Sequence, residues 1–260
     1  MPLVAAAVCP QPPLLVPEVA AGAAGELDEL RSACDEAVRR LLAPEPGIVV
    51  LLGSGPTTRE YPPPYRASFR RWGADVEATL DEKGLAGPAL PLSLAVGVWL
   101  VRRALSRPDT AAGRVRRPTS WRAQTIAADA TPAECAAVGA GLRSAAGSDD
   151  WALLVLGDGS ACRGEKAPGY DDPRAEPFDK TVAQALATAD LDTLRDLDPA
   201  LAAELRVAGR SPWQVLASAA GSVPRWYGDL LYEAAPYGVA YLVATWTPST
   251  SLRVDEGGSA

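Results

Sequence analysis

Four short runs of apolar residues are spaced along the chain, at residues 3–8, 48–52, 151–156 and 238–246. The first three stop abruptly at cysteine, proline, glycine or acidic residues. A run without a polar side is typical of a strand that is covered on both faces. We therefore expect these segments to be interior strands of one sheet, with a further strand-like stretch at residues 74–80.

Between these runs, apolar residues recur every three or four positions, which is the spacing of one helix face. In residues 26–42 the acidic residues come early and Arg39 and Arg40 come late, in agreement with the helix dipole. We expect further helices at residues 93–105, 132–146, 178–187, 199–207 and 212–219.

Buried strands that alternate with helices predict an α/β protein. We expect a single three-layer domain over residues 1–260, with a mostly parallel or mixed central sheet and helices on both faces. The polar residues 247–260 are expected to form a frayed tail.

The amino-acid composition limits the kinds of partner that this domain is expected to bind. The 260 residues include 25 Lys and Arg against 32 Asp and Glu, which gives a net charge of −7. A chain this acidic lacks the positive field that attracts nucleic acid. No apolar stretch is long enough to span a membrane, and residues 2–8 are not preceded by a basic leader. We expect a cytoplasmic protein with reduced thiols that binds neither nucleic acid nor membranes.

The sequence contains no histidine. This excludes Ser-His-Asp and Cys-His catalysis, histidine-ligated zinc, and an iron site made of two histidines and a carboxylate. Any catalysis must therefore use other groups.

Candidate chemistry lies in the loops that follow the strands, because ligands of open α/β sheets bind at the carboxyl ends of strands. The loop at residues 157–174 is unusually long and polar, which is more typical of function than of a simple connection. We expect the following residues to line a pocket there: Pro12, Glu18, Ser54, Gly157, Cys162 and Tyr170.

Several separated motifs resemble the class III extradiol ring-cleavage dioxygenase superfamily. They are residues 10–18, 53–56, 157–160, 167–170, 178–179, 211–216 and 232–239. Together they are similar to the LigB and Memo-like proteins, especially to an actinobacterial branch of them. The resemblance implies the LigB/Memo-like fold and a role in aromatic compound metabolism, and family members use ferrous iron.

The iron ligands of that family are missing here. Its first motif reads Pro-His-Pro-Pro, and this chain has Gln11 at the histidine position. Its third motif reads Gly-Asp-x-Ser-His, and this chain ends the motif with Ala161. Glu233 is the candidate for the family carboxylate. We therefore predict no cofactor, and we interpret Gln11 and Ala161 as degenerate ligand positions that still face one cavity.

The favoured hypothesis is a pseudoenzyme that binds a small molecule or a protein partner. One alternative is an oxidoreductase with a metal held by Cys9, Cys162 and Asp158. Another is a metal-free hydrolase or lyase, for which the candidate catalytic residues are Asp158, Ser160, Glu233, Tyr170 and Tyr237. A third is a subunit of a homo- or hetero-oligomer with an aromatic interface built from Trp213, Trp226, Tyr227, Tyr232 and Tyr237.

Overall fold

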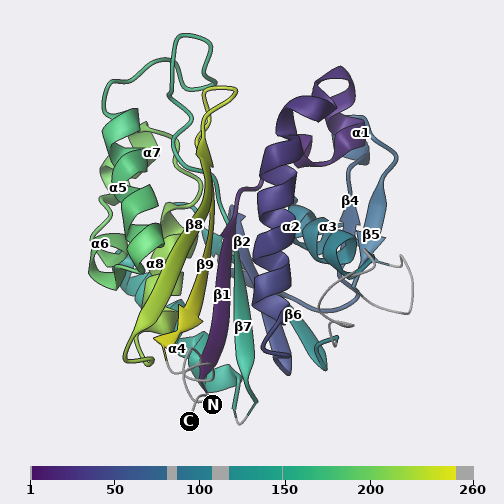
Figure 1. The fold of residues 1–260 in the computed structure, drawn as a ribbon, viewed down its shortest axis with the longest axis vertical. Coiled ribbons are helices and arrows are strands. Elements are labelled where there is room, and N and C mark those ends of the chain that lie inside the picture. Colours follow the sequence, from purple (N-terminus) through teal and green to yellow (C-terminus); the bar gives the residue numbers. More distant parts are fainter. Residues whose placement is uncertain (1, 81–86, 107–116, 148, 250–260) are drawn as a thin grey trace, which may run out of the picture.

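The computed structural model describes residues 2–80, 87–106, 117–147 and 149–249. Within these residues, seven strands form one sheet (Figure 1). Its strands, in spatial order, are β3 (Arg59–Tyr61), β6 (Ser120–Ala127), β2 (Ile48–Gly55), β7 (Trp151–Leu156), β1 (Leu3–Cys9), β9 (Tyr241–Pro248) and β8 (Trp226–Ala234).

The sheet is mixed. Strands β6, β2, β7 and β1 are parallel, whereas β3, β9 and β8 run antiparallel to their neighbours at the two edges. Leu156 of β7 is level with Cys9 of β1 and Gly53 of β2. The carboxyl ends of the central strands therefore meet at one edge of the sheet, where α/β proteins place their ligands.

Helices cover both faces (Figure 1). On one face lie α2 (Asp28–Leu42) and α3 (Leu92–Ser106), with the small hairpin of β4 (Arg66–Ser68) and β5 (Glu77–Thr79) packed on α3. Short turns connect these elements: η1 (Pro13–Leu15), α1 (Pro17–Ala20), η2 (Ala21–Leu27) and η3 (Arg70–Trp72). On the other face lie α4 (Pro132–Ala145), α5 (Ala175–Thr188), α6 (Leu191–Arg195), α7 (Pro199–Glu204) and α8 (Arg210–Ala220). The three-layer α/β architecture is confirmed.

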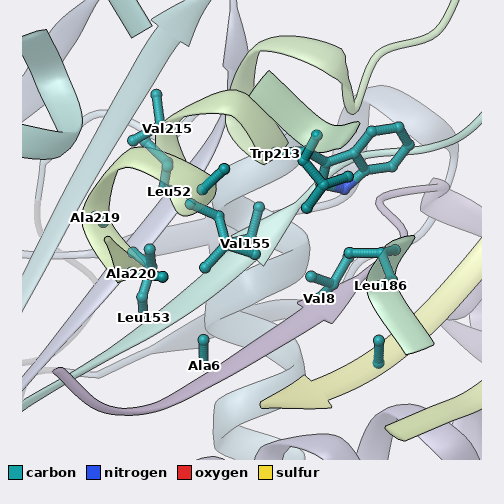
Figure 2. Close-up of a cluster of buried hydrophobic side chains, with 14 of the residues drawn as sticks. Ala6, Val8, Leu52, Leu153, Val155, Leu186, Trp213, Val215, Ala219 and Ala220 are labelled. Carbon is teal, nitrogen blue, oxygen red and sulfur yellow. The ribbon is translucent and has the colours of Figure 1, made fainter. Parts of the chain in front are cut away.

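The apolar strands fill two cores, one on each face of the sheet. Successive side chains of a strand point to opposite faces, so Ala6 and Val8 of β1 join the core under α5 and α8, while Ala7 and Cys9 join the core under α2 and α3. Figure 2 shows part of the first core, which includes Trp213 of α8, Leu52 of β2 and Val155 of β7. Because β1, β2 and β7 are covered on both sides, their sequences are apolar at nearly every position.

The strand expectations are confirmed for the four apolar runs, with β9 shorter at its start and longer at its end. Thr247 and Pro248 belong to β9, so the expectation of a frayed tail is wrong for these two residues, and residues 250–260 lie outside the described part of the chain. No helix within the described ranges is both long and apolar enough to cross a membrane.

Candidate functional site

Two loops join where β1 and β7 end. The Gly157 N–H donates to the carbonyl of Cys9 at 3.1 Å, and the Gln11 N–H donates to Asp158 Oδ1 at 2.7 Å. Prolines on both sides of Gln11 fix its backbone in an extended conformation. The structure thus brings together two of the residues that the sequence singled out.

Asp158 is a partly buried carboxyl group without a counter-ion. In the described part of the chain, no Arg or Lys forms a salt bridge with it. Burial raises the pKa of Asp158 to about 7, although the hydrogen bond from the Gln11 backbone opposes this shift. A carboxyl group that titrates near neutrality at the end of a strand is typical of functional sites.

Gln11 has an unsatisfied side chain. Its Oε1 atom is buried and accepts no hydrogen bond from the described residues. A buried acceptor without a donor is costly, by about 1–3 kcal/mol, and in native proteins it calls for an explanation.

Tyr241 is a site residue that the sequence analysis missed. It is the first residue of β9 and only 3% exposed. Burial raises the pKa of its hydroxyl above the usual range, and the nearby negative charge of Asp158 adds to this effect. Tyr241 lies inside an apolar run, so only its place beside the end of β1 reveals it.

Ser160 is buried and fastened to α5 rather than free to react. Its Oγ donates to Asp179 Oδ2 at 2.6 Å, and its N–H donates to Asp179 Oδ1 at 2.8 Å. Arg163 lies 3.3 Å from the same carboxylate. Asp179 therefore holds the loop after β7 in place, and this explains Ser160 better than a role as a nucleophile does.

Gly157 allows two backbones to touch. A Cβ at this position would collide with the Cα of Gly209, whose N–H donates to the carbonyl of Asp158 at 2.8 Å. The resulting contact between the loop after β7 and the start of α8 fixes the backbone on both sides of the Asp158 side chain.

Ala161 and Cys162 are bonded to the end of α7. Ala161 donates its N–H to the carbonyl of Leu205 at 2.9 Å, and Cys162 is buried with its Sγ 3.5 Å from the same carbonyl. Cys162 lies in the core under α5 and α8, whereas Cys9 lies in the core under α2 and α3. The hypothesis of a metal held by Cys9, Cys162 and Asp158 is therefore wrong, because the sheet separates the two thiols.

The donor set does not fit ferrous iron. Iron sites of this kind need two imidazoles and a carboxylate on one face, and this chain offers an amide at Gln11 and a methyl group at Ala161 in place of the expected nitrogens. Across residues 2–80, 87–106, 117–147 and 149–249, no cluster of three or more Cys, Asp or Glu side chains could hold a metal ion.

The remaining candidates are dispersed. Glu233 is exposed on β8 and lines a cavity of about 290 Å³ with Glu29 and Tyr232. The Tyr237 hydroxyl donates to Glu26 at 2.9 Å, and Tyr170 is 77% exposed. The expected hydrolase set of Asp158, Glu233 and a tyrosine therefore does not form one hydrogen-bonded group.

The expected pocket residues also separate. Glu18 lines a different cavity, of about 520 Å³, between α1, β5 and α3. Pro12 is buried, and its carbonyl accepts a hydrogen bond from the Leu15 N–H. The carbonyl of Ser54 accepts a hydrogen bond from the Ser93 hydroxyl at 2.8 Å. Only Gly157 of this group directly supports the junction at Asp158.

The aromatic residues near the C-terminus are largely internal. Trp213 and Trp226 are buried in the core, as is usual for large aromatic residues, so the alternative of an aromatic interface does not hold for these two. Tyr227 is 48% exposed, and Arg225 lies over its ring.

Comparisons with known proteins add little about activity. No protein-family model matches the chain, and no curated protein matches it. Among solved structures, an uncharacterized protein from Escherichia coli K12, JW3007, is similar with a TM-score of 0.48 and 15% identity, over 94% of this chain and 99% of that one. Such low identity transfers no activity.

Proposed function

We propose that this chain is a LigB-like protein without an iron centre that binds a small molecule at the carboxyl ends of β1 and β7. The observation that carries the proposal is the junction of Gln11 and Asp158, a pair of polar groups held rigidly at the sheet edge where α/β proteins bind ligands. Its unused acceptor atoms suit recognition rather than redox chemistry.

The absence of histidine supports binding without ring cleavage. Losing even the groups that orient metal ligands typically weakens metal binding or activity about 10- to 100-fold, and here the ligand positions themselves hold Gln11 and Ala161. We also place the protein in the cytoplasm, because all four cysteines are buried thiols without disulfides.

A second candidate function is metal-free proton transfer by Asp158. Its pKa of about 7 suits a group that accepts and returns a proton at neutral pH. The negative charge of Asp158 also contributes to the raised pKa of Tyr241. This candidate requires turnover of a substrate, whereas the binding proposal requires only saturable affinity.

The test begins with the metal. The protein is purified without chelator, incubated anaerobically with ferrous iron, desalted, and analysed for iron, zinc and manganese. We expect less than about 0.1 metal ion per chain and no oxygen uptake with catechol, because the chain lacks imidazole ligands. The matched Asp158→Asn variant should give the same values. A ratio near one that falls in Asp158→Asn, together with oxygen uptake, would overturn the proposal.

A further inference from the structure

We propose that the site formed by Gln11, Asp158 and Tyr241 binds a small organic ammonium ion, which donates hydrogen bonds to the Asp158 carboxylate and to Gln11 Oε1. This inference rests on the proposed function and names the class of ligand that the same site takes. It follows from three observations: unused acceptors, the lack of a counter-ion, and the surrounding side chains.

The site offers acceptors that the described chain does not use. Asp158 Oδ1 receives the Gln11 N–H at 2.7 Å, which leaves the second carboxylate oxygen available. Gln11 Oε1 is buried without a hydrogen-bond donor. An ammonium group has several N–H donors and no acceptor, so it complements both oxygens at once.

Two arginines that contact or belong to these loops are bonded to other groups. Arg31 is buried and bonded to the carbonyls of Leu15 and Ala24 and to Asp28. Arg163 pairs with Asp179. A partly buried carboxylate without a counter-ion favours either a proton or a bound cation, so a cationic ligand would supply the missing counter-ion.

The neighbouring side chains also favour an organic cation. Tyr241 is close enough to Asp158, Tyr232 and Tyr237 for their charges to affect its hydroxyl. Glu26 bonds to Tyr237, and the charge of Glu29 acts on Tyr232. Tyrosine rings attract cations, and the net charge of −7 disfavours anionic ligands. A carboxylate or phosphate ligand is therefore disfavoured.

The probe is benzylammonium chloride, and benzyl alcohol is its neutral counterpart of similar shape. Binding is measured by isothermal titration calorimetry at about pH 8, where a carboxyl group with a pKa of about 7 is mostly ionised. We expect benzylammonium to bind the wild-type protein at least about tenfold more tightly than benzyl alcohol, as charge-assisted hydrogen bonds outweigh neutral ones.

Three variants test which side chains are responsible for benzylammonium binding. Asp158→Asn keeps an oxygen for the Gln11 N–H but removes the charge, and Gln11→Met removes the amide oxygen at similar length. Both should weaken benzylammonium binding, the first by about tenfold or more. Glu60→Gln, on the exposed edge strand β3, should leave it unchanged. Far-UV circular dichroism verifies that each variant is folded.

Amide spectra of the wild-type protein give a readout that does not depend on variants. Benzylammonium should shift the Gln11 amide resonance in a ¹⁵N-labelled sample, because that N–H contacts Asp158. Equal binding by wild type and folded Asp158→Asn, or no binding and no shift at Gln11, overturns the inference. Iron uptake with oxygen consumption would instead overturn the proposed function, so the two failures are distinguishable.

Discussion

At the scale of single residues, the ionisation of Asp158 makes the stability of the folded protein depend on pH. Its pKa is raised from 3.8 to about 7, so between these values the folded protein holds a proton that the unfolded chain releases. Stability therefore falls as pH rises from about 4 to about 7. Asp158→Asn removes this dependence, and we expect the variant to gain about 2 kcal/mol relative to wild type between pH 5 and pH 8.

Urea unfolding of both proteins at several pH values measures this difference. The comparison between variant and wild type cancels the titration of every other group, including Asp179, whose pKa burial also raises. A difference that stays constant from pH 5 to pH 8 would show that Asp158 is well solvated.

Gly157 is a second residue whose identity the structure demands. In Gly157→Ala the new methyl group meets the backbone of Gly209, so we expect a loss of about 1–3 kcal/mol from overpacking. Gly141→Ala is the matched control, since its Cβ meets nothing within 4 Å and it lies inside α4. That variant should gain up to about 1 kcal/mol from helix propensity. Thermal unfolding measures whether each variant is less or more stable than the wild-type protein.

At the scale of elements, Asp179 on α5 organises the long loop after β7. Asp179→Ala leaves the buried Ser160 hydroxyl and N–H without an acceptor, which we expect to cost about 1–3 kcal/mol. The loop should also open more often, so trypsin should cut faster after Lys166. Thr181→Ala is the control, because Thr181 is exposed on the same helix and its hydroxyl donates to the carbonyl of Pro177 within that helix. Unchanged cleavage in Asp179→Ala would mean that other contacts hold the loop.

The start of α4 depends on a capping box. Thr131 Oγ1 accepts the Glu134 N–H, and the Glu134 carboxylate accepts the Thr131 N–H at 2.8 Å. We expect Thr131→Ala to lose about 1 kcal/mol in chemical unfolding. Thr188→Ala, at the exposed end of α5, should change little, because the hydroxyl of Thr188 bonds only within its own helix.

Whether an element could be predicted from the sequence depended on how completely it is buried. Strands β2 and β7 are apolar at nearly every position because both their faces are covered. Strand β8 escaped prediction because it is an edge strand whose Tyr227, Asp229 and Glu233 face solvent. Strand β6 was also missed, since Arg122 and Gln124 interrupt its apolar residues.

The residues of the site, too, could be predicted from the sequence only in part. Gln11 and Asp158 were predictable because each follows a buried strand, and parallel strands bring such residues to one edge. Tyr241 was not, because its place depends on the antiparallel pairing of β9 with β1, far away in the sequence. The role of Asp179 depends likewise on a hydrogen bond to Ser160, 19 residues away.

At the scale of the whole molecule, the sheet couples the two cores. Each central strand sends alternate side chains into both, so neither core can be lost without exposing the strands that build the other. We therefore expect one cooperative unfolding transition. The test is urea unfolding followed by far-UV circular dichroism and by the fluorescence of the buried Trp151, Trp213 and Trp246. Coincident curves support coupling through the sheet, while separate midpoints would show that α2 and α3 detach from an intact remainder.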